Sequence, residues 1–253
     1  MGNLTASVAM ITYNSSKYLR PQLESILVNL REFDELVICD DGSEDDTVEI
    51  IKSYNDSRIK LFINPVNLGV NGNMNKALSL CANDVIYLSN ADDVWLDGKI
   101  SSSISKFTKK NVVIVSHDLS ITDMDLNVTE KSFNKLRNSR PGLIHNLIKN
   151  GFCGPNMCFR REMLQYILPF PKKMPFWFDE WIGLICEKHG KSVFYNEVYV
   201  LWRRHSGCVS FSSLINQQST KKVIFLHKIV QMIKKIIHFI KNRIIRLFYI
   251  LKR

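Results

Sequence analysis

Two adjacent carboxylates, Asp92 and Asp93, follow an apolar run over residues 85–88 that reads as a buried strand. Carboxylates at the end of such a strand are costly to desolvate unless a cation or hydrogen-bond donors meet them. Oxygen ligands of this kind suit Mg²⁺ or Mn²⁺, especially an ion that is shared with substrate phosphates. The same stretch, which includes Asn90 and Ala91, could also form a turn. The motif alone therefore leaves a metal site and a turn as alternatives.

Polar residues end two other apolar runs, so the acidic motif is not isolated. The run over residues 6–12 leads into Thr12–Asn14, and the run over residues 36–39 leads into Asp40 and Asp41. Helically spaced apolar residues separate the runs, and this alternation predicts a parallel sheet with right-handed crossovers. Ligands of such sheets bind beyond the carboxyl ends of the strands. We therefore expect the three polar ends to meet in one site.

The second half of the chain gives weaker signals. Residues 118–139 are polar with little periodicity, so a loop is expected there. Short apolar segments elsewhere predict further elements, with helices at residues 100–107, 144–148 and 177–189 and strands at residues 112–115 and 193–200. Together with the first half, they predict one α/β domain, which we place at residues 1–218.

The six cysteines form no Cys-x-x-Cys pair, and several lie in apolar runs. They predict free, buried thiols in a reducing compartment rather than a zinc site or a disulfide framework. The N-terminal residues contain no basic region followed by an apolar core, so no secretory signal is expected. We therefore expect the protein to be cytoplasmic.

The net charge of +10 is concentrated at the C-terminal end. Residues 221–253 hold ten of the 34 Lys and Arg and no acidic residue, which leaves 24 basic against 24 acidic residues in the rest. Apolar residues recur there at steps of four and three, but Lys and Arg interrupt them too often for a membrane span. We predict that residues 219–253 form a basic amphipathic helix on an anionic membrane surface.

The composition of this tail also bears on two other uses. The same steps of four and three match the heptad repeat of a coiled coil, so a homodimer through the C-terminal helix is the alternative. Nucleic-acid binding is not expected, because no element that reads bases accompanies the basic residues. A membrane-surface helix on a cytoplasmic protein predicts a peripheral protein at the inner face of the cytoplasmic membrane.

Six segments resemble, in their order along the chain, the motifs of the family 2 glycosyltransferases, which have a GT-A fold. The segments are Ile11–Asn14, Val37–Ser43, Asn67–Val70, Ser89–Trp95, Phe178–Trp181 and Trp202–His205. They extend over most of residues 6–210, and the nearest likeness is to bacterial enzymes of the rhamnosyltransferase type. The resemblance implies a Rossmann-like, mostly parallel sheet flanked by helices. It also implies transfer of a sugar from a nucleotide-diphosphate donor during polysaccharide synthesis.

The resemblance implies a UDP- or dTDP-sugar as donor and Mg²⁺ or Mn²⁺ as cofactor. Asp92 and His205 match the metal-binding positions, where the ion would offset the charge of the leaving diphosphate. Asn90 departs from the family pattern, which usually has Asp, and this loss of charge lowers the expected metal affinity. The residues matched to nucleotide-sugar binding are Thr12, Tyr13, Asn14, Asp40, Asp41, Asn73, Asn90, Ala91, Asp92 and Arg203.

Asp179 matches the catalytic acidic residue of the family, which would act as the general base on the acceptor hydroxyl. Its aromatic neighbours would raise its pKa. Glu180 is the alternative base, and on a helix the two side chains point about 100° apart. Direct displacement with one base inverts the anomeric carbon of the sugar. The acceptor is expected to be a saccharide or a lipid-linked saccharide. A non-catalytic nucleotide-sugar-binding protein and a metal-dependent nucleotidyltransferase remain alternative functions.

Overall fold

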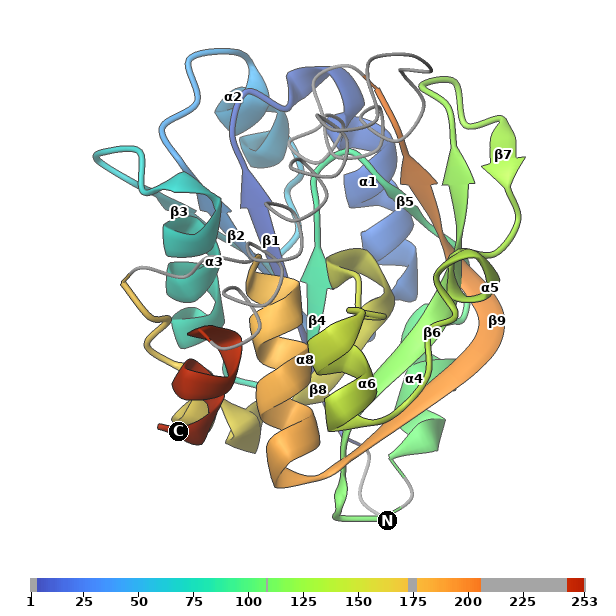
Figure 1. The fold of residues 1–253 in the computed structure, drawn as a ribbon. Helices are drawn as coiled ribbons and strands as arrows, with labels where there is room; N and C mark the ends of the chain where they lie inside the picture. Colours follow the sequence, from blue (N-terminus) through green and yellow to red (C-terminus); the bar gives the residue numbers. More distant parts are fainter. Residues whose placement is uncertain (1–3, 108, 173–176, 206–244, 253) are drawn as a thin grey trace, which may run out of the picture.

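The computed structural model of the protein describes residues 4–107, 109–172, 177–205 and 245–252. In this part of the chain, a nine-stranded sheet has the order β3-β2-β1-β4-β8-β6-β9-β5, and β7 pairs with β6. Helices lie against both faces of the sheet (Figure 1). The α/β class predicted from the sequence is therefore confirmed.

The elements of the first half begin and end close to their predicted positions. The strands are β1 (Ala6–Thr12), β2 (Glu35–Asp40), β3 (Ile59–Ile63), β4 (Val85–Ser89), β5 (Val94–Trp95), β6 (Val112–Thr122), β7 (Val128–Glu130), β8 (Met157–Arg160) and β9 (Lys191–Arg203). The helices are α1 (Ser16–Asn29), α2 (Thr47–Lys52), α3 (Gly69–Leu80), α4 (Lys99–Lys106), α5 (Phe133–Arg137), α6 (Leu143–Ile148), α7 (Leu164–Ile167) and α8 (Phe178–His189). The 3₁₀ turns η1 (Gly154–Asn156) and η2 (Arg161–Met163) flank β8, and residues 245–251 are helical.

The first four long strands are parallel. β1 lies between β2 and β4, and β2 pairs with β3 on its other side. Alternate residues of β1 face opposite layers, as the pleat of a strand requires. Val8 and Met10 pack in the core cluster that includes α1, whereas Ala9 packs in the cluster that includes α3 and α8. This arrangement places the carboxyl ends of β1, β2 and β4 at one edge.

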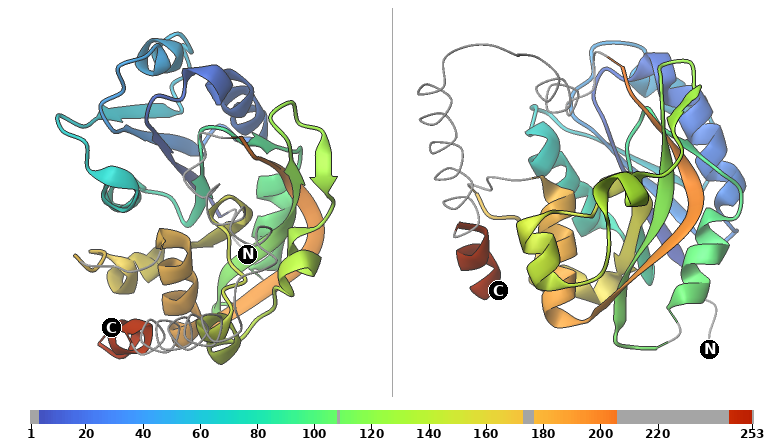
Figure 2. Two further views of the ribbon diagram at one scale, coloured as in Figure 1. Left: turned by 45° about the horizontal axis from the view of Figure 1, so that its top comes forward. Right: turned by 45° about the vertical axis from the view of Figure 1, so that its right-hand side comes forward.

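The second half of the sheet is mixed. β8 is antiparallel to β4 and β6, and β9 runs parallel to β6. Figure 2 shows β9 (orange) curving alongside β6 (green). Near its end β9 pairs antiparallel with β5, with Leu201 opposite Val94 and Val200 opposite Trp95. This pairing brings the end of β9 to the residues that follow β4.

The prediction of a loop at residues 118–139 is wrong. β6 continues to Thr122, β7 pairs with it, and α5 follows. Asp118 is buried and accepts hydrogen bonds from the Ser132 hydroxyl and from the backbone N–H of Asn134 at 2.9 Å. Asp118 is thus buried with partners from the same segment, as buried polar groups generally are. The strand expected at residues 193–200 is also longer, because β9 pairs with β6 and β5 in succession.

Most of the predicted C-terminal helix, residues 219–244 and 253, lies outside the described residues. The described end of it, residues 245–251, packs against α8. Arg246 forms an ion pair with Glu180, and Lys188 Nζ donates to the carbonyl of Ile250 at 2.8 Å. The helix that carries Asp179 is therefore in contact with the end of the tail.

The exposed face of residues 245–251 is apolar. Leu247 and Leu251, two members of the predicted apolar stripe, are 43% and 68% exposed, whereas Ile250 is buried. Of the helices that the structure describes, none is both long enough and apolar enough to cross a membrane. Five cysteines are free and buried as predicted, and Cys208 lies outside the described residues.

Candidate active site

The corner after β2 is built around Asp40. Its buried carboxylate accepts hydrogen bonds from the hydroxyls of Thr12 at 2.7 Å and of Ser43 at 2.6 Å. It also accepts the backbone N–H groups of Ser43 at 2.8 Å and Gly42 at 3.2 Å. Gly42 has a φ of +80°, which favours glycine in this tight turn. Asp40 therefore fastens the end of β1 to the loop that follows β2.

Asp41 holds the next corner in the same way. Its carboxylate is buried and accepts hydrogen bonds from Asn64 Nδ2 at 2.7 Å and from the backbone N–H groups of Leu68 at 2.8 Å and Gly69 at 2.9 Å. Asn73 accepts a hydrogen bond from Asn64 at 2.9 Å and donates to the backbone of β2 at 2.9 Å. These contacts fix the start of α3 beside the end of β2.

The residues after β1 reach the surface at this edge. Tyr13 is 52% exposed, and the exposed Asn14 has a φ of +45°. The Asn14 backbone N–H donates to the Ser43 hydroxyl at 2.9 Å, and its Oδ1 accepts the Glu44 backbone N–H at 2.9 Å. Of the residues predicted to bind nucleotide in this region, Tyr13 and Asn14 are thus accessible, whereas Thr12, Asp40, Asp41 and Asn73 are buried.

At the end of β4 the two adjacent carboxylates face different surroundings. The side chains of Asp92 and His205 are 27% and 16% exposed, and Asp92 Oδ2 lies 3.1 Å from His205 Nε2. Asp93 is fully buried, and accepts the Arg203 backbone N–H and the Asn90 side chain, each at 3.1 Å. Burial, reinforced by the charge of Asp92, raises the pKa of Asp93 well above its usual range. Asp92 therefore lies at the surface of the site and Asp93 supports it from inside.

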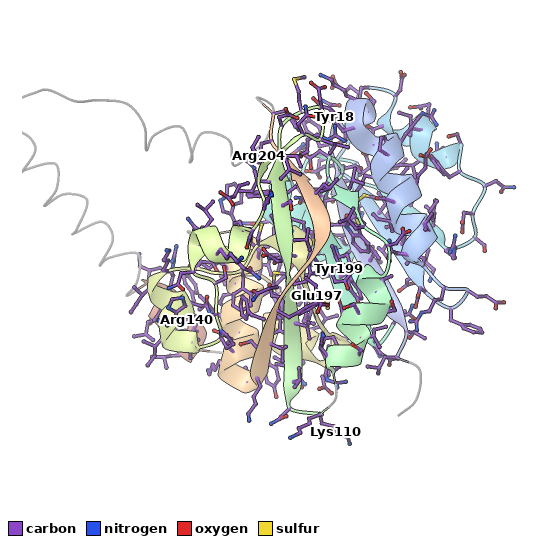
Figure 3. The ribbon with its side chains drawn as sticks, turned by 90° about the vertical axis from the view of Figure 1, so that its right-hand side faces the viewer. Tyr18, Lys110, Arg140, Glu197, Tyr199 and Arg204 are labelled. Atoms are coloured by element: carbon purple, nitrogen blue, oxygen red, sulfur yellow. The ribbon has the colours of Figure 1, made fainter. Side chains whose placement is uncertain are left out.

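Arg203 and Tyr18 hold the Asp92 segment in place. Arg203 Nε donates to the carbonyl of Asp92 at 2.8 Å, and Nη1 donates to that of Met124 at 2.6 Å. The guanidinium and the His205 ring each lie 4.6 Å from the centre of the Tyr18 ring. Figure 3 labels Tyr18, at the start of α1, near the end of β9. The observed contacts of Arg203 thus position the acidic motif, and its predicted contact with donor remains a proposal.

The donor set of Asp92 and His205 fits a divalent cation. A carboxylate oxygen and an imidazole nitrogen converge, and both side chains are partly exposed. Among the described residues, no group of three or more His, Cys, Asp and Glu is placed to hold a metal. Two protein ligands would leave the other positions to phosphate oxygens and water, which is how Mg²⁺ is commonly bound at phosphate sites.

Three polar side chains of α1, which sequence reasoning missed, form hydrogen bonds with the backbone of the segment that contains the acidic motif. The buried Gln22 donates to the carbonyl of Asn90 at 2.9 Å, and the Ser25 hydroxyl accepts the Trp95 backbone N–H at 3.0 Å. Asn29 accepts the first backbone N–H of α4 at 3.0 Å. The spacing of three and four residues places these side chains on one face of α1, and this polar periodicity was visible in the sequence.

Asp179 lies in the first turn of α8, beside η1. Its Oδ2 accepts the Gly154 backbone N–H at 3.1 Å, and its Oδ1 accepts the Glu180 backbone N–H at 2.7 Å. Burial raises the pKa of Asp179 to about 6. Glu180 pairs with Arg246 instead, so the two acidic side chains have different partners, as their helical positions predict. Only Asp179 is held against η1.

Cys153, the residue before η1, is buried. Burial raises the pKa of its thiol well above the usual range, and the charges of Asp179 and Asp93 act on it in the same direction.

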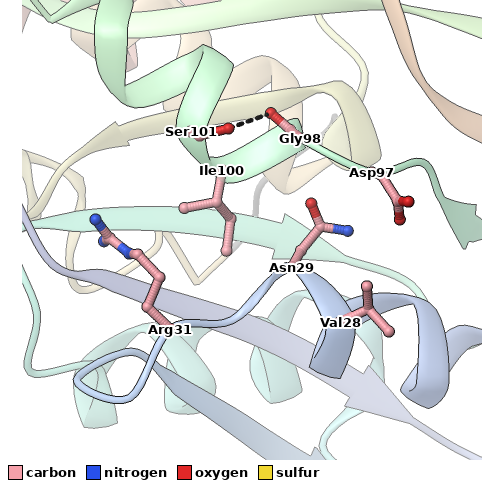
Figure 4. Close-up of a pocket in the computed structure, with 7 residues that line it drawn as sticks. All are labelled: Val28, Asn29, Arg31, Asp97, Gly98, Ile100 and Ser101. Atoms are coloured by element: carbon pink, nitrogen blue, oxygen red, sulfur yellow. Dashed lines mark hydrogen bonds between the residues drawn. The ribbon is translucent and has the colours of Figure 1, made fainter.

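One hollow of about 250 Å³ lies elsewhere, between the end of α1 and the start of α4 (Figure 4). None of the predicted site residues lines it, so it does not belong to the site at the strand ends. Its lining residues are Val28, Asn29, Arg31, Asp97, Gly98, Ile100 and Ser101.

Comparison with solved structures supports a GT-A fold. The structure superimposes on residues 1–349 of TarS from S. aureus, in complex with UDP-GlcNAc, with a TM-score of 0.65 and 17% sequence identity. The match covers 81% of this chain and 60% of the TarS chain, so this chain spans less than two thirds of that structure. The mostly parallel, helix-flanked architecture expected from the sequence is therefore confirmed.

Comparison of sequences identifies the family. An uncharacterized glycosyltransferase of Nostoc is 28% identical over 230 residues, which cover 85% of this chain and 70% of the relative. A glucosyltransferase of Escherichia coli, WfaP, is 28% identical over 233 residues, which cover 88% of this chain and 89% of the relative. Residues 7–168 match the model of glycosyl transferase family 2. The match extends over more than half of the sequence, and the chain belongs to glycosyl transferase family 2.

Proposed function

We propose that this glycosyltransferase moves a sugar, with inversion, from a UDP- or dTDP-sugar to a saccharide carried on a lipid diphosphate. The observation that carries the proposal is the meeting of Asp92 and His205 at the strand ends, with Asp179 held separately against η1. The relative WfaP supports the substrate class, because it is named a UDP-Glc:alpha-D-GlcNAc-diphosphoundecaprenol beta-1,3-glucosyltransferase. This class of acceptor belongs to the synthesis of cell-surface polysaccharides.

In this proposal the donor lies along the edge formed by β1, β2 and β4. The exposed Tyr13 and Asn14 would contact the base and ribose, and Asn90 to Asp92 would contact the ribose and diphosphate. Asp40, Asp41 and Asn73 contribute by shaping the corner, since their side chains already bind neighbouring protein groups. Arg203 contributes positive charge beside the diphosphate while it holds the carbonyl of Asp92.

Mg²⁺ or Mn²⁺ would be held by Asp92 and His205, and would supply a Lewis acid that offsets charge on the departing diphosphate. Asp93 keeps this arrangement in place from the interior through Asn90 and the backbone of Arg203. Tyr18 packs against His205 and limits the positions that the imidazole ring can take.

Asp179 is the proposed general base. Its carboxylate takes the proton of an acceptor hydroxyl as the hydroxyl oxygen forms its bond to the anomeric carbon, while the bond to the diphosphate breaks with its electron pair. Two backbone N–H groups, those of Gly154 and Glu180, orient the carboxylate. A single base with direct displacement gives inversion, through a transition state with oxocarbenium character.

The products of a donor incubation test this function against the two alternatives. The purified protein is incubated with a panel of UDP- and dTDP-sugars, with and without a saccharide carried on a lipid diphosphate. A glycosyltransferase releases nucleoside diphosphate, faster with acceptor present, and glycosylates the acceptor. Release of pyrophosphate would instead indicate a nucleotidyltransferase. Binding of donor without either product would indicate a non-catalytic protein.

We further propose that residues 1–218 form the catalytic domain and that residues 219–253 attach it, as a peripheral protein, to the inner face of the cytoplasmic membrane. Ten Lys and Arg without acidic residues in the last 33 positions favour an anionic surface. The exposed Leu247 and Leu251 supply apolar area beside them. A homodimer through the tail is the competing proposal.

Replacing Leu247 and Leu251 together by Glu should weaken sedimentation with anionic vesicles, because two apolar side chains that would enter the membrane become two charges that an anionic surface repels. Both side chains are exposed, so the packing of Ile250 against α8 should persist. The control replaces the exposed Val28 and Val66 by Glu and should sediment as the unmodified protein does. If the Leu variant instead turns a dimer into a monomer and sediments unchanged, the tail is a dimer interface.

A further inference from the structure

A lysine with no exposed surface, Lys99, lies between the acidic motif and the turn that holds Asp179. It is the first residue of α4, and Gly98 before it has a φ of +83°. Its Nζ donates to the carbonyl of Pro155, in η1, at 2.8 Å, and lies 3.4 Å from the centre of the Trp95 ring. The lysine thus connects the segment after β4 with η1.

Such a placement is costly, because an ammonium group loses its hydration when it is buried. Burial lowers the pKa of Lys99 well below its usual range, and the neighbouring Cys158 and Asp93 offset this shift only in part. Asp93 is itself fully buried, and its carboxylate accepts hydrogen bonds from the Asn90 side chain and from the backbone N–H of Arg203. A hydrophobic residue would avoid this cost, so the contacts of Lys99 serve something other than simple packing.

The contact with Pro155 leads directly to the proposed base. Pro155 is the central residue of η1, and the residue before it, Gly154, donates its N–H to Asp179. Space at this turn is limited, because a side-chain carbon at Gly154 would lie 3.2 Å from the Phe178 ring. A small movement of η1 would therefore change the hydrogen bond that orients Asp179.

We infer that Lys99 is a positioning residue for sugar transfer: it fixes η1, and through Gly154 it sets the orientation of Asp179. This inference rests on the proposed role of Asp179 as the base. Lys99 has no exposed surface, so its effect is transmitted through the Pro155 carbonyl.

The Lys99→Met variant tests this inference, because Met has a similar length and lacks the Nζ donor that binds the Pro155 carbonyl. Without the Nζ contact, η1 should shift and the Gly154 hydrogen bond to Asp179 should weaken. A misplacement of this kind lowers kcat by about 10², with the KM for donor nearly unchanged. The hydrogen bond stabilises the ionised carboxylate, so its loss should raise the pKa of Asp179. The acid limb of the pH–rate profile should therefore move to higher pH.

Lys106→Met is the matched control, since Lys106 is in the last turn of the same helix and lies over the Tyr195 ring at 4.8 Å. It should leave kcat and the pH–rate profile unchanged. Titration of the Asp179 carboxyl by NMR in the free protein gives a readout that does not depend on activity. The pKa should rise in Lys99→Met and stay constant in Lys106→Met.

The inference is overturned if Lys99→Met is folded and the Asp179 titration is unchanged, whatever the rate of transfer. It is also overturned if only the KM for donor rises, because Lys99 would then serve the acidic motif alone. Failure of the proposed function gives a different result. In that case the unmodified protein forms no glycosylated product, while the NMR titration still reports whether Lys99 positions Asp179.

Discussion

The Asp179→Asn variant should transfer sugar about 10²–10⁴-fold more slowly than the unmodified protein, because Asn has the shape of Asp but cannot take a proton. Donor binding should change little, since Asp179 contacts η1 and not the strand ends. Steady-state transfer to acceptor gives the rate, and a thermal shift with nucleoside diphosphate gives the binding. Because burial raises the pKa of Asp179 to about 6, transfer by the unmodified protein should fall as the pH decreases through about 6.

The neighbouring acid provides the control for this prediction. Glu180→Gln removes an ion pair with Arg246, so it should lower the melting temperature while most of the transfer rate remains. If Glu180→Gln abolishes transfer and Asp179→Asn is mild, the base is Glu180. The transfer rates and melting temperatures of the two variants therefore distinguish the role of Asp179 from that of Glu180.

The Asp92→Ala variant should lose transfer and remain folded. Its partly exposed carboxylate contacts His205 at the surface of the site, so its removal leaves no cavity in the core. The loss should appear as weaker Mn²⁺-dependent stabilisation by nucleoside diphosphate in a thermal shift. An unliganded protein gains about 2.7 kcal/mol from a ligand at a hundred times its dissociation constant, so the difference is measurable.

Two further variants sharpen this result. Asp97→Ala, at an exposed position in the connection between β5 and α4, should transfer sugar normally. Asn90→Asp restores the carboxylate that the family usually has, and should preserve or raise metal affinity. Full activity of Asp92→Ala, or full activity of the unmodified protein in excess chelator, would contradict metal-assisted departure of the diphosphate.

The parallel half of the fold was predictable because its strands are uniformly apolar and its helices have apolar residues at helical spacing. Residues 85–88 and 36–39 could not be mistaken for surface segments, and the polar residues after them mark the strand ends. The sheet confirms that these ends meet at one edge, since β1 lies between β2 and β4. The resemblance, not the spacing, indicated that residues near 203 belong to the same edge.

The features that could not be predicted from the sequence depend on contacts between residues that are not neighbours in the sequence. Asp118 suggested a loop because its partners, Ser132 and Asn134, are recognisable only in the fold. Lys99 looks like a surface residue, because buried ammonium groups are rare. The carboxylate of Asp40 looks available for ligand, although four protein groups donate to it. In each case, the partner that decides the role of the side chain cannot be read from local sequence.

The pairing of β9 with β5 also has a consequence for how the chain folds as it is synthesised. The strands β1 to β4 are consecutive neighbours in the sequence and can associate while the chain is still growing. Val94 and Leu201, by contrast, are more than 100 positions apart, and contacts of such separation form slowly. Asp92 meets His205 only after residue 205 has left the ribosome. The order of synthesis therefore makes this edge the last part of the sheet to close.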